Sequence, residues 1–129
     1  MKKIDKFIRE RKKLNDLIFK KSNLEIKRFF NLDSRVYEEG ALPRKFKELL
    51  GLVASLVLRC DDCITYHLIR CKEEKVKDEE LVEALSVGLI VGGSITIPHL
   101  RRAFETWEGL KKKNKKYLIK EEKNVKRRT

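Results

Sequence analysis

The chain has 129 residues, of which 41% are hydrophobic and 40% are charged; this balance suits one globular domain with a modest core and excludes a disordered chain. Its formal net charge of +12 sits mainly at the ends, since residues 1–21 carry nine Lys and Arg against three acids and residues 111–129 carry ten against two. Because neither basic end shows interleaved aromatics or a recognisable nucleic-acid-binding motif, a nucleic acid is not an expected partner.

Residues 1–37 are predicted to form an amphipathic helical extension. Apolar side chains recur over residues 2–31 at spacings of three and four, and Ser22 and Asn23 favour a break between two helices. Charges interrupt every apolar run at the N-terminus, which is not the pattern of a signal peptide. The longest weakly charged stretch, residues 84–99, is too short and too interrupted by glycine and proline to cross a bilayer. We therefore expect a cytoplasmic protein without membrane contacts.

Residues 38–110 are predicted to form a helical core. After a loop, apolar residues return with a helical period over residues 44–57. A turn is expected at Cys60, because either Asp61 or Asp62 can cap the helix that follows.

Two more helices are expected to complete this core. Asp78 is expected to cap the first, whose early acidic residues suit the positive end of the helix dipole. That helix is apolar almost all round, which indicates a central position, and Gly92 and Gly93 are expected to end it. Pro98 suits the first turn of the last helix, after which a basic tail covers residues 111–129. Since no strand-like alternation is convincing, the sequence predicts an all-α, single-domain bundle.

The residues with the clearest chemistry are Cys60 and Cys63, which form a CxxC motif, and His67. A thiol at the start of a helix has a lowered pKa because backbone N–H groups and the helix dipole stabilise the thiolate. Such a pair suits reversible disulfide formation. His67 lies one helical turn after Cys63 and can move a proton between thiol and substrate near neutral pH.

The two aspartates between the cysteines act in the opposite direction. Negative charge close to a thiol raises its pKa, and Arg59 offsets only part of the charge on Asp61 and Asp62. We therefore expect thiols that are less acidic than those of strongly oxidising CxxC proteins.

Glu48 is the fourth candidate residue. On one straight helix it would lie about 18 Å from Cys60, too far for contact. If the chain turns at Cys60 and the two helices run antiparallel, Glu48 comes level with His67 and can orient its imidazole. Taken alone, His67 is more often a structural histidine and Glu48 a surface acid.

A zinc site is the main alternative to a redox pair for these cysteines. Cys60, Cys63, His67 and Cys71 are tempting ligands, but along one helix they would span about 16 Å and could not converge on one ion. No metal or cofactor is therefore expected. Cys71 is predicted to be a buried small apolar residue, and His99 a capping or surface residue.

The order of these motifs resembles the AhpD-like core of the carboxymuconolactone decarboxylase superfamily over residues 38–108. The resemblance rests on Glu48, the Cys60–His67 run with its CxxC, the acidic helix start from Asp78 and the pair Gly92-Gly93. One departure is Asp62, because the best-known peroxidase branch has a histidine just before the second cysteine.

This resemblance implies an all-helical fold, homo-oligomers that are commonly trimers or hexamers, and alkylhydroperoxidase or disulfide reductase activity. It implies that Cys60 and Cys63 are the redox pair and that Glu48 and His67 form the proton relay. The expected partners are then a peroxide or disulfide substrate and a dithiol electron donor. Two alternatives stay open: a carboxymuconolactone decarboxylase-like lyase that uses only Glu48 and His67, and a non-enzymatic helical protein that binds partners through its basic ends.

Overall fold

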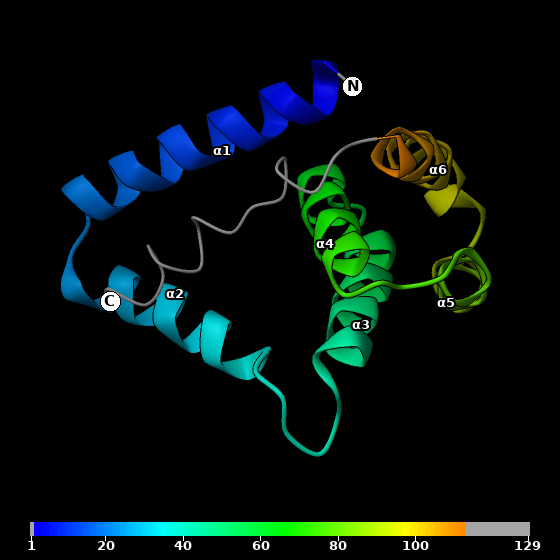
Figure 1. Ribbon diagram of the computed structural model, residues 1–129, viewed down its shortest axis with the longest axis horizontal. Coiled ribbons are helices and arrows are strands. Elements are labelled where there is room, and N and C mark those ends of the chain that lie inside the picture. Colours follow the sequence, from blue (N-terminus) through cyan, green and yellow to red (C-terminus); the bar gives the residue numbers. More distant parts are fainter. Residues whose placement is uncertain (1, 113–129) are drawn as a thin grey trace. The chain divides into compact units, whose positions relative to one another are not determined.

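The computed structural model describes residues 2–112, and Figure 1 shows them as a set of helices. No strand occurs within those residues, so the predicted all-α fold is confirmed. Among the described helices, none has the length and apolar content that a membrane span requires. The elements are α1 (Lys2–Lys21), α2 (Leu24–Val36), α3 (Arg44–Val57), α4 (Asp61–Glu73), α5 (Asp78–Gly92), the 3-10 turn η1 (Ser94–Thr96) and α6 (Ile97–Lys111).

The described residues fall into two compact units, residues 2–38 and residues 39–112. The three segments that the sequence suggests, 1–37, 38–110 and 111–129, stay a prediction, and most of the basic tail lies outside the described residues.

The first unit consists of α1 and α2. The predicted break at Ser22 and Asn23 is confirmed, because the Asn23 side chain caps α2 by accepting the Ile26 N–H at 3.0 Å. Phe19 and Phe30 bring their rings together across the break, with centroids 4.9 Å apart. None of the residues of α2 is buried.

The second unit is built around α3, which packs against both α4 and α5, while α4 also packs against α6 (Figure 1). This arrangement encloses one small core whose members are apolar residues from all four helices. They include Leu52, Leu56, Ile64, Leu68, Leu81, Leu85, Ala103, Trp107 and Leu110, each at most 2% exposed.

The expectation that α5 is central was wrong. α5 buries one face, and a methyl group added at Gly88 would lie 2.9 Å from Leu56 Cδ2, so the glycine allows close approach to α3. The opposite face leaves Val87, Ile90 and Val91 exposed by 55%, 82% and 69%. The apolar composition of α5 therefore reflects two faces, one packed against α3 and one exposed.

The cap of α5 also differs from the expectation. Lys77, and not Asp78, is the N-cap residue, and its N–H donates to Glu80 Oε1 at 2.8 Å. The Asp78 carboxylate instead accepts hydrogen bonds from Trp107 Nε1 at 2.9 Å and Lys111 Nζ at 2.8 Å. Asp78 thus ties the start of α5 to α6.

Candidate active site

The turn between α3 and α4 has the hydrogen bonds of a Schellman motif. The Cys60 N–H donates to the Ser55 carbonyl at 3.1 Å, and the Arg59 N–H donates to the Leu56 carbonyl at 3.0 Å. Arg59 takes the left-handed backbone conformation that this motif requires, with φ of 60°. The turn expected at Cys60 is therefore present, and its backbone hydrogen bonds set the position of Cys60.

Cys60 itself caps α4, where the sequence suggested Asp61 or Asp62. Its sulfur accepts the Cys63 N–H at 3.2 Å, and the two aspartates form the first turn of the helix. A sulfur can take this place because the N-cap residue has an extended backbone, here with φ of −103° and ψ of 99°.

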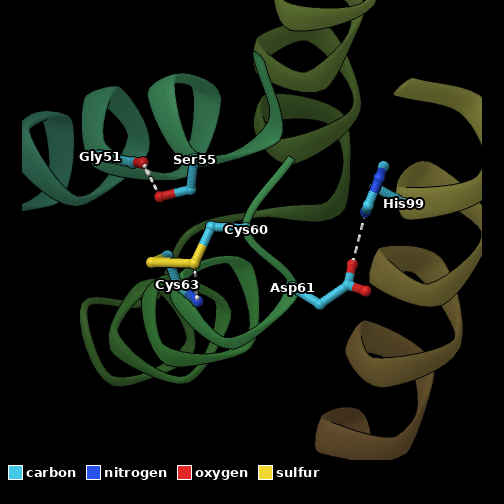
Figure 2. Close-up of a disulfide and its surroundings, with 6 residues drawn as sticks. All are labelled: Gly51, Ser55, Cys60, Asp61, Cys63 and His99. Atoms are coloured by element: carbon cyan, nitrogen blue, oxygen red, sulfur yellow. Dashed lines mark hydrogen bonds and ion pairs between the residues drawn. A yellow bond between two sulfur atoms is a disulfide. The ribbon is translucent and has the colours of Figure 1, made fainter. Parts of the chain in front are cut away.

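Cys60 and Cys63 form a disulfide whose Cα atoms lie 5.3 Å apart (Figure 2). Cys63 is exposed and Cys60 is partly buried, so an external thiol or peroxide can approach from the Cys63 side. Ser55 of α3 also lies in the surroundings of the disulfide, and its hydroxyl donates to the Gly51 carbonyl at 2.7 Å.

Glu48 and His67 meet across the α3–α4 pair. Glu48 Oε1 lies 2.9 Å from His67 Nδ1, and the two side chains are 2% and 12% exposed. Because an ionised carboxylate only accepts hydrogen bonds, Nδ1 donates to Glu48 in this contact. Cys63 and His67 stand one turn apart on α4, so the imidazole shares a helix face with the second sulfur.

Arg70, which the sequence did not indicate as a site residue, contacts Glu48 from α4. Its side chain is 4% exposed, its Nε donates to Glu48 Oε2 at 3.4 Å, and its Nη1 pairs with Glu73 Oε1. Burial alone would lower the pKa of Arg70, but the carboxylates of Glu73 and Glu48 raise it overall, so the guanidinium stays charged. The i, i+3 spacing from His67 to Arg70 could have indicated a shared helix face, but nothing local shows that this face meets Glu48.

Asp61 has two partners on α6 that the sequence did not indicate. His99 Nδ1 lies 2.8 Å from Asp61 Oδ1, and Arg102 Nε donates to Asp61 Oδ2 at 3.0 Å. His99 of α6 thus has a partner on α4. Burial is the largest single influence on Asp61 and raises its pKa, but the hydrogen bonds and charges of His99 and Arg102 together outweigh it, so the pKa is lowered overall.

Cys71, the third cysteine, is fully buried, as the sequence predicts. Burial raises the pKa of its thiol strongly, and the nearby Glu48 carboxylate raises it further. A thiol in this state is a poor nucleophile. Among residues 2–112, no three His, Cys, Asp or Glu side chains come together in a way that could hold a metal ion.

The structure therefore brings Glu48 of α3 to His67 of α4, and joins Cys60 to Cys63 at the start of α4. It adds Arg70, which contacts Glu48 and Glu73, and it adds His99 and Arg102, which contact Asp61 next to Cys60. The catalytic roles of Glu48, Cys60, Cys63 and His67 stay predictions.

Several solved structures share this fold. A carboxymuconolactone decarboxylase family protein from Thermotoga maritima, for which involvement in an antioxidative response is suggested, is 58% identical, with a TM-score of 0.80 over 82% of this chain and 90% of its own. A second crystal structure from Thermotoga maritima gives 58% identity and a TM-score of 0.81 over 82% of this chain and 93% of its own. The apo form of a carboxymuconolactone decarboxylase family protein from Legionella pneumophila is 23% identical, with a TM-score of 0.78 over 84% of this chain and 97% of its own, and supports the fold alone.

Curated sequence relatives are more distant. An uncharacterised protein from Cupriavidus necator is 26% identical over 73 residues, which make up 57% of this chain and 65% of that protein. An uncharacterised protein of the cox locus of Paracoccus denitrificans is 27% identical over 75 residues, or 58% of this chain and 68% of that protein. The chain thus spans about two thirds of the length of these relatives.

The family model described as the carboxymuconolactone decarboxylase family matches residues 26–106, which is more than half of the chain. This range includes all four sequence-predicted site residues and both helices that carry them. The chain belongs to the carboxymuconolactone decarboxylase family.

Proposed function

We propose that this protein is a thiol-dependent peroxidase or disulfide reductase, an AhpD-like oxidoreductase that cycles Cys60 and Cys63 between dithiol and disulfide. The observation that carries the proposal is the Cys60–Cys63 disulfide at the N-terminus of α4, together with the hydrogen bond between Glu48 of α3 and His67 of α4. Backbone N–H groups at a helix start favour a thiolate, which is the reactive form of cysteine.

The oxidising half of the cycle consumes one peroxide. A thiolate attacks an oxygen of the O–O bond, that bond breaks, and an alcohol leaves with a proton supplied by the His67 imidazole. The resulting sulfenic acid reacts with the second thiol, which forms the disulfide and releases water. Two electrons pass from the two thiols to the peroxide, so the step is balanced without a bound cofactor.

The reducing half requires a dithiol donor. A donor thiolate attacks one sulfur of the disulfide, and the second donor thiol resolves the mixed disulfide, returning two electrons and two protons to the pair. With a disulfide substrate in place of a peroxide, the same exchange runs in the opposite direction. A reducing compartment such as the cytoplasm supplies donors of this kind.

Glu48 and His67 serve as the proton relay in this proposal. Hydrogen bonding to Glu48 fixes the imidazole orientation and stabilises the imidazolium that forms when His67 takes a thiol proton. The suggested antioxidative involvement of the 58% identical Thermotoga maritima protein supports the same type of activity.

The test is peroxide consumption with dithiothreitol as the donor. We expect wild type to consume an alkyl hydroperoxide catalytically, and Cys60→Ser and Cys63→Ser to lose at least about 10²-fold in rate, because each removes one half of the disulfide. Cys71→Ser is the matched control, since that thiol is buried away from solvent, and it should retain the wild-type rate. Equal rates in all four proteins would contradict the proposal.

The same variants separate the alternatives. A lactone decarboxylase-like activity that survives loss of both Cys60 and Cys63 would select a lyase that uses Glu48 and His67 alone. DNA or RNA binding that weakens steeply with salt and disappears on deletion of residues 111–129 would select the non-enzymatic binding protein.

A further inference from the structure

Asp61 directly follows the capping cysteine and carries a charge that opposes thiolate formation. A carboxylate near a thiol raises its pKa, and at this position it can also compete with the sulfur for the unpaired N–H groups at the start of α4. A redox pair with this neighbour therefore needs a means of directing the carboxylate elsewhere.

Two side chains of α6 hold the Asp61 carboxylate by both of its oxygens. His99 Nδ1 lies 2.8 Å from Oδ1, and Arg102 Nε donates to Oδ2 at 3.0 Å. Arg102 Nη2 also lies 3.2 Å from His99 Nδ1, so the two holding groups contact each other. Figure 2 shows the Asp61 side chain turned toward His99 and away from the sulfur atoms.

We propose that His99 and Arg102 are positioning residues that hold the Asp61 carboxylate away from Cys60 and Cys63. This inference rests on the proposed redox function and adds to it a way in which α6 adjusts the thiol pair. None of the three residues needs to touch the substrate.

The consequence for the thiols follows from charge and from geometry. While Asp61 is held, Arg102 balances its charge and the N–H groups of α4 remain available to the Cys60 sulfur. When it is released, the carboxylate can turn toward those N–H groups, so the thiolate loses stabilisation and the disulfide becomes harder to reduce. Asp61 and Arg102 are 46% and 53% exposed, so solvent weakens the effect.

Each charged residue of the proposal has an exposed neighbour of the same charge that can serve as a control. Arg101 of α6 is exposed and has the same charge as Arg102, and Asp62 is exposed and has the same charge as Asp61. Arg101→Ala and Asp62→Asn therefore repeat each charge change without removing a contact of the Asp61 group.

The experiment measures two equilibrium properties of the purified protein. One is the apparent thiol pKa, from the pH dependence of alkylation of the reduced protein, and the other is the equilibrium constant for reduction by dithiothreitol. For Arg102→Ala we expect the thiol pKa to rise by about half a unit and the reduction constant to fall about threefold. His99→Ala should act in the same direction, and Arg101→Ala should match wild type.

A double variant separates positioning from simple charge. In an Asp61→Asn background no carboxylate remains to be held, so adding Arg102→Ala should shift the thiol pKa by much less than in wild type. Arg102→Lys keeps the charge but loses the planar group that contacts Asp61 through Nε and His99 through Nη2. Its thiol pKa should lie between those of wild type and Arg102→Ala.

An equal shift from Arg102→Ala in both backgrounds, or the same shift from Arg101→Ala, would overturn the inference. Neither readout requires peroxidase activity. A protein without that activity would contradict the proposed function while leaving this test intact, and an active protein whose thiol pKa ignores Arg102 would contradict only the present inference.

Discussion

Glu48 Oε1 and His67 Nδ1 lie 2.9 Å apart, although the two residues are 19 positions apart along the chain. The contact joins the second turn of α3 to the middle of α4, and it exists because the chain reverses at the Schellman turn before Cys60. A nearly buried carboxylate on one helix thereby orients an imidazole on the next. This hydrogen bond is the structural basis for the proposed proton relay next to the disulfide.

Replacing Glu48 by Gln should remove the negative charge from this contact while keeping the side-chain shape and an oxygen that accepts a hydrogen bond. We expect the peroxidase rate to fall about 10²-fold, because the imidazolium of His67 loses the carboxylate that stabilises it. We also expect a stability loss of about 3 kcal/mol, because the buried Arg70 loses one of its two carboxylates. Peroxide assays and urea unfolding measure the two effects, and Glu79→Gln on the exposed surface of α5 should change neither.

Arg70→Met tests the cation beneath the relay. Removing the guanidinium leaves Glu48 and Glu73 as two buried carboxylates with less compensation, so we expect a loss of about 3–5 kcal/mol in the free energy of unfolding. Arg70→Lys keeps the charge without the forked geometry and should lose less. A variant Arg70→Met that unfolds at the wild-type urea concentration would show that the cluster adds little to stability.

Asp78 should contribute to the acid sensitivity of the fold. Hydrogen bonds from Lys111 and Trp107 hold the pKa of Asp78 below its ordinary value in the folded state. Stability from this group is therefore fully present above the unfolded pKa of about 4 and is lost as pH falls through the lower folded pKa. Asp78→Asn should show a smaller decline in Tm than wild type on acidification. Asp62→Asn removes a carboxylate but leaves the Trp107 and Lys111 hydrogen bonds to Asp78 in place, and it should keep the wild-type decline.

Lys75 is a second residue in the left-handed conformation, with φ of 62°, at the end of α4. Its N–H donates to the Lys72 carbonyl at 3.1 Å, and the Val76 N–H donates to the Cys71 carbonyl at 3.0 Å, which is again a Schellman motif. Because glycine adopts this conformation without strain, Lys75→Gly should raise stability by about 1 kcal/mol. Glu74→Gly, one residue earlier at φ of −87°, should give no such gain in thermal unfolding.

The exposed face of α5 is the surface on which we expect the predicted self-association. Val87, Ile90 and Val91 are 55%, 82% and 69% exposed there, and burying them in a second copy would remove apolar surface from water. Light scattering should give wild type a mass above that of one chain, and Ile90→Asp should lower it. Arg101→Ala, on the exposed surface of α6, should leave the mass unchanged, and a monomeric wild type would contradict the prediction.

Much of the local structure is visible in the sequence itself. The breaks near Asn23, Gly93 and Pro98 and the apolar period of each helix depend on residues a few positions apart, whose backbone preferences act locally. The CxxC motif at a helix start can be predicted for the same reason. The N-cap residue of α4 could not, because three neighbouring side chains compete for the Cys63 N–H and the Cys60 sulfur, not Asp61 or Asp62, accepts it.

The sequence by itself determined the helices, the turn at Cys60 and the candidate pairing of thiols, acid and imidazole. Only the tertiary structure decided that Arg70 lies behind Glu48, that His99 and Arg102 hold Asp61, and that α5 buries one face and exposes the other. The physical reason is that these contacts join residues 22 to 41 positions apart, and they form only where packed helices bring distant side chains within hydrogen-bond distance.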